Sequence, residues 1–126
     1  MIVGIGTDLV HIPRMQLLID KYNDKIAKRI LSDSEFEDFQ QAPRPAAFLA
    51  KRFAAKEATA KAFGTGFRNG LSLRDISVSN NAYGKPELSF YKQGQALLEE
   101  LSIGRCFLSL SDESEYATAY VILMER

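Results

Sequence analysis

The alternation of apolar and polar residues predicts strands at both ends of the chain. Residues 2–12 (IVGIGTDLVHI) form a β-branched, apolar run typical of a strand. Residues 76–79 and 88–90 alternate on either side of the turn-rich NNAYGKP, which predicts a hairpin. Phe107 to Ser111 and Tyr116 to Met124 predict a second hairpin around a polar loop at 112–114. The last run is almost continuously apolar, as expected of a central strand.

Helical patterns fill the space between these strands. Phe48 to Gly66 is rich in alanine and predicts one long, largely buried helix that ends at Gly64 or Gly66. Pro13 begins a helical pattern over residues 14–31, with a break near Asn23 and Asp24. Two shorter helices are predicted at SDSE, whose capping box starts a helix running to about Gln41, and at GQALLEELSIG, closed by Gly104. The order predicts an α+β fold, a single domain of residues 1–126 whose antiparallel β-sheet carries the long helix on one face.

Composition narrows the classes of function. The net charge is zero, with 16 basic and 16 acidic residues, which argues against a protein that coats nucleic acid. No apolar run approaches the ~18 residues of a membrane helix. Cys106 is the single cysteine, so no intrachain disulfide is possible, and no cysteine or histidine cluster has zinc-site spacing. We therefore expect a cytoplasmic protein that binds neither nucleic acid nor a membrane.

Three charged residues in apolar surroundings are candidates for a catalytic or metal-binding site. Glu57 and Lys61 are four residues apart, on one side of the long helix. Asp8 follows Gly4 and Gly6, which let another backbone or a ligand come close. An intrahelical ion pair and a turn aspartate remain open interpretations. If Asp8 and Glu57 meet, two carboxylates without a histidine describe a magnesium site, and Lys61 is placed to contact phosphate.

A second candidate feature is a basic stripe. Arg14, Lys21, Lys25 and Lys28 recur at intervals of seven, four and three, with Leu17 and Leu18 nearby. Such a stripe suits the docking of an acidic helical partner, although an ordinary solvated face explains it equally well. His11 is expected to be a surface residue, because no second histidine is present to share a metal.

The motifs together resemble a known family. IVGIGTDLVHIPRM and FLAKRFAAKEATAKAFGTG are similar to the holo-[acyl-carrier-protein] synthases, small phosphopantetheinyl transferases with a G-x-D signature near the start and a K-E-A-x-x-K helix. YGKPELSF and LSLSDESEYATAYVIL resemble the third and fourth segments of that family. The resemblance covers essentially the whole chain, in the same order and spacing.

This resemblance implies an activity and its residues. The enzyme would transfer the 4'-phosphopantetheine arm of coenzyme A to a serine of apo acyl carrier protein, in support of fatty acid biosynthesis. Asp8 and Glu57 match the Mg²⁺ ligands and Lys61 matches the pyrophosphate-contacting lysine, so these three are the expected catalytic residues. The basic stripe from Arg14 matches the helix that docks the carrier protein. A homotrimer with the site between subunits is implied, so Asp8 and Glu57 need not meet within one chain.

Some assignments stay open at this point. Arg52, Lys56 and Gly64 are further candidates for contacts with coenzyme A, although salt bridges or subunit contacts explain the two cations equally well and a helix stop explains Gly64. Asp112 stands where many relatives have a histidine. Two other functions are compatible with parts of the pattern. One is a non-catalytic trimeric module that binds an acidic partner, and the other is a different magnesium-dependent phosphoryl-transfer enzyme.

Overall fold

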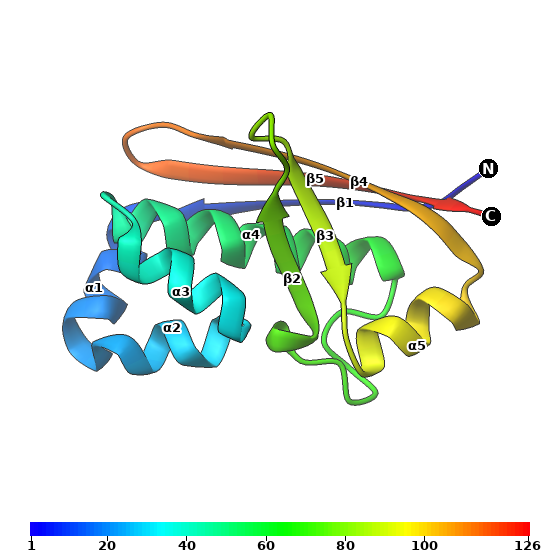
Figure 1. The fold of residues 1–126 in the computed structure, drawn as a ribbon, viewed down its shortest axis with the longest axis horizontal. Coiled ribbons are helices and arrows are strands. Elements are labelled where there is room, and N and C mark those ends of the chain that lie inside the picture. Colours follow the sequence, from blue (N-terminus) through cyan, green and yellow to red (C-terminus); the bar gives the residue numbers. More distant parts are fainter.

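A three-stranded antiparallel sheet forms one side of the molecule. The computed structural model describes residues 1–126. Strands β1 (Ile2–His11), β5 (Tyr116–Glu125) and β4 (Ile103–Asp112) lie in the order β1-β5-β4, so β5 is the central strand, as its apolar run predicts (Figure 1). Both chain termini lie at the same end of this sheet. The Met1 amino group pairs with Glu125 at 3.1 Å there.

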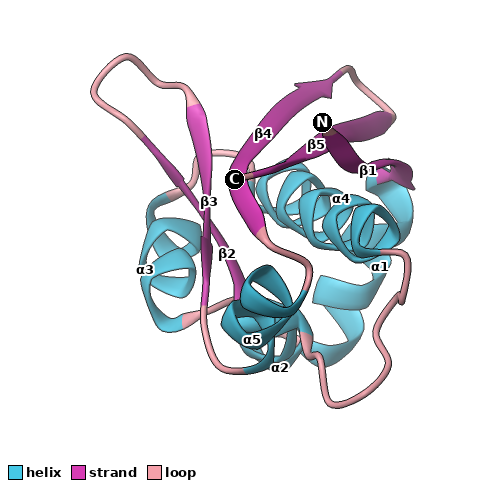
Figure 2. Cartoon of the chain, turned by 90° about the vertical axis from the view of Figure 1, so that its right-hand side faces the viewer, coloured by secondary structure: helices cyan, strands magenta, loops and turns pink.

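Helix α4 (Pro45–Phe63) lies against one face of this sheet, and the remaining elements pack around α4 (Figures 1 and 2). Strands β2 (Ile76–Asn80) and β3 (Pro86–Phe90) form a separate two-stranded sheet. The other helices are α1 (Ile12–Tyr22), α2 (Asp24–Ile30), α3 (Asp33–Gln41) and α5 (Gln93–Glu100), and a short 3₁₀ turn spans Leu73–Asp75. The predicted α+β class and the antiparallel sheet on a long helix are confirmed, but the strands form two sheets rather than one.

Several boundaries differ from the predicted ones. Helix α4 begins at Pro45 instead of Phe48, because a proline at the first helical position extends the helix without losing a hydrogen bond. Gly64 ends α4 in the left-handed conformation, with φ 82°, as predicted. Helix α5 ends at Glu100, and Gly104 lies within β4 instead of closing that helix. The predicted break is present at Asn23, whose φ is 54°.

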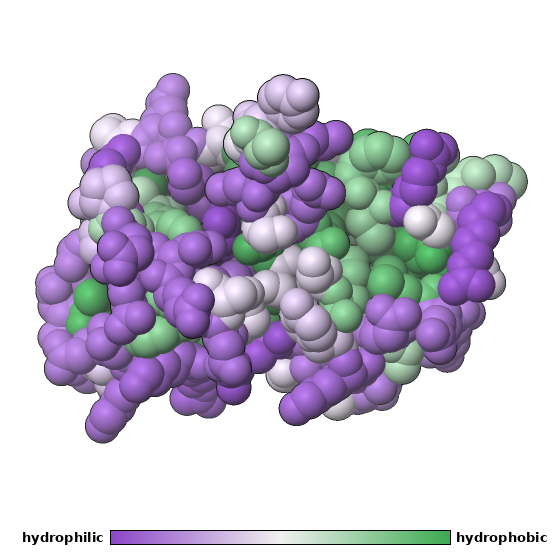
Figure 3. All heavy atoms as spheres, viewed as in Figure 1, coloured by the Kyte–Doolittle hydropathy of each residue, from purple (hydrophilic) through white to green (hydrophobic).

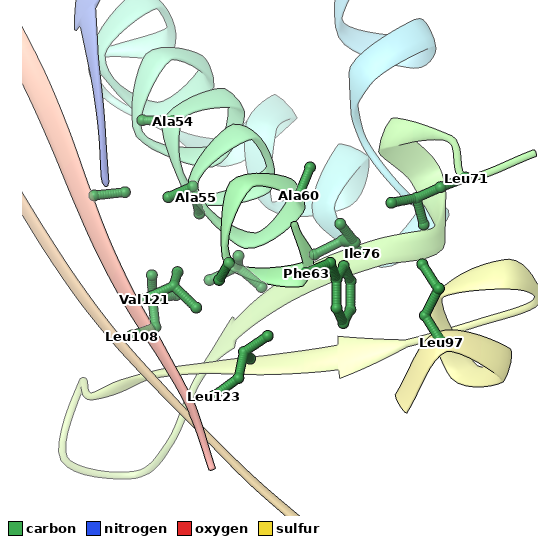
Figure 4. Packing of buried hydrophobic residues seen from close by; sticks show 14 of the residues in the cluster. Ala54, Ala55, Ala60, Phe63, Leu71, Ile76, Leu97, Leu108, Val121 and Leu123 are labelled. Atoms are coloured by element: carbon green, nitrogen blue, oxygen red, sulfur yellow. The ribbon is translucent and has the colours of Figure 1, made fainter. Parts of the chain in front are cut away.

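Two hydrophobic clusters line α4 along its length. One includes the residues from Ala54 to Phe63 that face β4, β5, the β2–β3 hairpin and α5 (Figure 4). The other includes Ala46, Leu49 and Ala50, together with side chains of α1, α2 and α3. On the face seen in Figure 3, the half formed by α1–α3 is mainly hydrophilic, whereas apolar side chains gather beside the hairpin, towards the ends of β4 and β5. Helix α4 therefore links two unlike halves of the molecule.

The two glycines of β1 bring this strand into contact with the α4 backbone. A Cβ atom on Gly4 would lie 1.9 Å from the carbonyl oxygen of Ala62, and one on Gly6 would lie 1.9 Å from that of Ala58. Real atoms cannot approach so closely, so any side chain would force strand and helix apart. The sequence-based expectation that these glycines admit another backbone is confirmed.

Gly6→Ala is therefore expected to lower the free energy of unfolding by about 3 kcal/mol or more, the upper range for overpacking. The matched substitution Gly64→Ala adds a Cβ that meets nothing within 4 Å. Its cost comes from the positive φ alone, about 1–2 kcal/mol. Urea unfolding of both variants measures the two losses, and equal losses would contradict the close contact between β1 and α4.

Candidate active site

The alternation of β1 places Asp8 on the same face as the two glycines. Gly4, Gly6 and Asp8 are the more buried positions, whereas Ile5, Thr7 and Leu9 are exposed on the opposite face. Since Gly6 contacts α4 near Ala58, Asp8 lies two residues further along, beside the same helix. The register between β1 and α4 therefore determines which α4 side chains the Asp8 carboxylate meets.

Asp8 meets the two charged residues singled out on α4. The Lys61 ammonium donates to Asp8 Oδ1 at 3.0 Å and to the carbonyl oxygen of Thr7 at 3.0 Å. Desolvation raises the pKa of Glu57 above its ordinary value, the Asp8 carboxylate raises it further, and Lys61 acts in the opposite sense. Asp8, Glu57 and Lys61 thus gather within one chain, although Asp8 is about fifty residues away from the other two in sequence.

A cavity of about 650 Å³ opens beside the two carboxylates. It lies where β1, α1, α2, α4 and the start of β5 meet. Its lining is mostly apolar, with Asp8, Glu57, Arg14 and Arg29 as its charged members; the remaining lining residues are Leu9, Val10, His11, Met15, Leu18, Ile26, Ile30, Phe53, Leu73 and Tyr116. A mostly apolar cavity with a few convergent charges is typical of a ligand site.

The two carboxylates suit a hard divalent cation. Mg²⁺ is usually held by one or two carboxylates, with water and substrate phosphates completing its shell. Asp8 and Glu57 place two carboxylates at the edge of an open cavity, and no third acidic, histidine or cysteine side chain forms a group of three with them. The raised pKa of Glu57 reflects partial desolvation and repulsion between the carboxylates, both of which a bound cation would offset. The donor set therefore fits magnesium together with a phosphate-bearing substrate.

The four basic residues predicted as one helical stripe lie on two helices. The chain turns at Asn23, so Arg14 and Lys21 belong to α1, while Lys25 and Lys28 belong to α2. The single-helix geometry assumed from their spacing is wrong, because it requires unbroken helical periodicity. All four side chains are nevertheless exposed, and Arg14 lines the cavity beside the carboxylates.

Other candidates are placed elsewhere. Arg52 and Lys56 are buried against Glu35 of α3, which agrees with the salt-bridge interpretation of these two cations. Gly64 serves as the helix cap, which agrees with a helix stop. Asp112 is the last residue of β4 rather than a loop residue, and its carboxylate pairs with Lys51 at 3.3 Å and Arg44 at 3.9 Å.

Sequence patterns did not identify several of the residues that line the cavity as site residues. His11 is exposed, as expected, and it also lines the cavity, where its ring lies 5.2 Å from that of Tyr116. Arg29, Ile26 and Phe53 reach the cavity from α2 and α4. No spacing in the sequence could identify them, because they come from elements that meet only in the folded chain.

Comparisons with known proteins give one consistent result. A family model described as the 4'-phosphopantetheinyl transferase superfamily matches residues 4–121. The holo-[acyl-carrier-protein] synthase of Yersinia enterocolitica is 47% identical over 122 residues, covering 97% of each chain. That of Photorhabdus laumondii is 48% identical, also over 97% of each chain.

Solved structures show the same fold. The holo-[acyl-carrier-protein] synthase of Neisseria meningitidis has a TM-score of 0.94 and is 46% identical, covering 99% of this chain and 100% of its own. The Bacillus anthracis enzyme, solved in complex with CoA (3',5'-ADP), has a TM-score of 0.84 at 36% identity over 100% and 99% of the two chains. In this chain, no helix combines the length and apolar character that crossing a membrane requires.

Proposed function

Because this chain belongs to the holo-[acyl-carrier-protein] synthase family of 4'-phosphopantetheinyl transferases, we propose that Asp8, Glu57 and Lys61 form its magnesium-dependent catalytic centre. The chain is a transferase that moves 4'-phosphopantetheine from coenzyme A to a serine of apo acyl carrier protein. The observation that carries the assignment of the centre is the convergence of Asp8 and Glu57 at one cavity, with the Lys61 ammonium bonded to Asp8. Convergence within one chain makes the centre testable by single substitutions.

Each residue has a role that follows from its charge and place. Asp8 and Glu57 would hold Mg²⁺, which supplies charge neutralisation to the pyrophosphate of coenzyme A during transfer. Lys61 is held by Asp8 and the Thr7 carbonyl, so its ammonium is positioned at the carboxylates, where it can contact phosphate oxygens. The mostly apolar lining of the cavity partly desolvates the Glu57 carboxylate, which strengthens the interaction of that carboxylate with a cation. Removing divalent metal is expected to stop the transfer, and adding Mg²⁺ back is expected to restore it.

We infer that the acyl carrier protein docks on α1 and α2. Exposed cations on both helices suit an acidic partner, and exposed Leu17 lies among them. Arg14 connects this surface to the catalytic cavity, since its side chain lines the cavity beside Asp8 and Glu57. A carrier protein bound there would present its serine directly to the proposed centre.

Reversing two charges of this surface, Arg14→Glu with Lys25→Glu, is expected to raise KM for the carrier protein at least 10-fold at low salt. The loss should shrink as ionic strength rises, because added salt screens the attraction between exposed charges in the wild type. Lys85→Glu, which reverses one charge on the β2–β3 hairpin, is the control for charge reversal outside this surface and should leave KM unchanged. Steady-state kinetics at two salt concentrations provide the measurement, and equal KM values in all three proteins would contradict the docking surface.

We further propose that the chain forms a homotrimer through the outer face of the three-stranded sheet. Ile5 of β1 lies opposite Ile122 of β5, which lies opposite Phe107 of β4, so an apolar row crosses the sheet. Ile5 and Leu9 are 56% and 62% exposed in the single chain. Contiguous exposed apolar surface of this kind is typical of a protein interface.

Ile5→Glu is expected to dissociate the trimer, because three carboxylates would be buried in the interface without partners. Sedimentation equilibrium measures the mass of the wild type and the variant, with Thr118→Ser as a mild control on the same face. A monomeric wild type at assay concentration would contradict the proposal. The cytoplasmic location and the single-domain organisation stay predictions.

A further inference from the structure

A buried cluster of charges ties α4 to its neighbours on the side away from β1. Lys56 and Glu35 are 0% exposed. The Lys56 ammonium donates to Glu35 Oε1 at 2.7 Å, to the Leu73 carbonyl at 3.0 Å and to the Ile76 carbonyl. Glu35 in turn accepts from the Val78 backbone N–H at 2.9 Å. One ammonium thus joins α4 to α3, to the 3₁₀ turn and to β2.

Stability alone is a weak explanation for this cluster. A buried ion pair often contributes no more to stability than well-packed apolar residues of the same volume, because both ions lose their hydration. Burial lowers the pKa of the Lys56 ammonium even though Glu35 acts in the opposite sense. The best attested use of such pairs is to fix one packing arrangement among several.

The rotation of α4 about its own axis requires such a constraint. Most of its buried side chains are the methyl groups of alanines, which surround the helix and are too small and too alike to distinguish strongly between neighbouring rotations. Ala58 contacts Gly6 of β1 on one side. At about 100° per residue, Lys56 lies about 160° around the helix from Ala58, so its three acceptors hold the opposite side.

Glu57 lies between these two contacts and follows Lys56 directly. A side-chain end is about 5–6 Å from a helix axis, so a rotation of about 10° displaces it by about 1 Å. A displacement of that size in a catalytic group can cost about 10²-fold in rate. We propose that Lys56, held by Glu35, is a positioning residue that sets the rotation of α4 and so directs Glu57 towards Asp8. This inference rests on the proposed function, in which these two carboxylates bind Mg²⁺.

The test is Lys56→Met, which keeps the length of the side chain but removes the ammonium. We expect kcat to fall about 10²-fold. KM for the carrier protein should stay unchanged, because the docking surface lies on α1 and α2. Mn²⁺ binding, followed by electron paramagnetic resonance in the presence of coenzyme A, should weaken about 10-fold to 100-fold. Thr59→Val is the matched control, since the Thr59 hydroxyl bonds only within α4, to the Ala55 carbonyl at 2.7 Å.

The double variant Glu35→Gln with Lys56→Met separates positioning from stability. It removes both charges of this pair, while Arg52, which pairs with Glu35 at 3.8 Å, loses its carboxylate. Urea unfolding measures the stability of both variants, and kcat and Mn²⁺ affinity should stay low in both, whatever stability the double variant recovers. Recovery of kcat and Mn²⁺ affinity together with stability would overturn the proposal, as would wild-type values of both in any folded variant of the cluster. If Lys56→Met, the double variant and Glu35→Gln alone all fail to fold, the cluster serves the fold instead and the proposal is overturned.

Absence of Mg²⁺-dependent transfer in the wild type would refute the proposed function, whereas wild-type transfer with unaffected variants refutes this inference alone.

Discussion

Glu57→Gln is expected to reduce phosphopantetheine transfer by at least about 10³-fold, at the upper end of the loss from removing one electrostatic contact. The substitution keeps the shape of the side chain and removes one of the two carboxylates at the cavity. Transfer to apo acyl carrier protein, measured at saturating Mg²⁺ and coenzyme A, provides the test. Glu100→Gln, on the exposed end of α5, is the matched control and should retain full activity.

The same variant should remain folded. The pKa of Glu57 is raised in the folded chain, so the folded state holds this proton more tightly than the unfolded state. Without divalent metal, the free energy of unfolding therefore falls as pH rises from the ordinary pKa of a glutamate through the raised one. Glu57→Gln removes that decrease and should be at least as stable as the wild type at neutral pH. Wild-type turnover in a folded Glu57→Gln protein would refute the role of Glu57 as a metal ligand.

Lys61→Met is expected to lower kcat about 10²-fold to 10³-fold, the range seen when one group that stabilises transition-state charge is removed. Lys61 is held at the carboxylates by Asp8 and the Thr7 carbonyl, where the pyrophosphate of coenzyme A would lie. Lys61→Arg should recover activity incompletely, because a guanidinium differs from an ammonium in both size and hydrogen-bonding geometry. Steady-state kinetics with varied coenzyme A measure both variants.

Stability should change little in Lys61→Met. The Lys61 side chain is 54% exposed, and a pair of this kind contributes about 0–1 kcal/mol. Lys85→Met, which removes an exposed lysine from the β2–β3 hairpin, is the control for the loss of one positive charge. A kcat in Lys61→Met equal to that of this control would exclude Lys61 from the catalytic centre.

Local sequence patterns predicted the elements better than their contacts. The alanine-rich composition of α4, its Gly64 cap and the Ser32–Glu35 capping box are each specified within a few neighbouring residues, and all three are present. The start of α4 at Pro45 was missed because prolines at 43 and 45 suggest a connecting segment, although a proline also fits the first helical position. The division of the strands into two sheets was missed because pairing partners are set by tertiary packing rather than by periodicity.

The site was predictable as a set of residues but not as a geometry. Asp8, Glu57 and Lys61 stood out because charges in apolar surroundings need a reason. Their meeting within one chain depends on the contact of Gly6 with α4, which no spacing reveals. Glu35 is a second residue whose local role was predictable while its tertiary contact was not. Its capping role is visible in the sequence, whereas its pairing with Lys56, 21 residues away, follows from the packing of α3 on α4.

The most direct test of the account is the intact mass of an apo acyl carrier protein after incubation with this protein and coenzyme A, with Mg²⁺ or with a chelator. A mass gain of one phosphopantetheine is expected with Mg²⁺ and none with the chelator. No gain is expected with Mg²⁺ when Glu57→Gln replaces the wild type. An equal gain with the chelator would contradict the metal-dependent centre at Asp8 and Glu57, and no gain in any sample would contradict the transferase function itself.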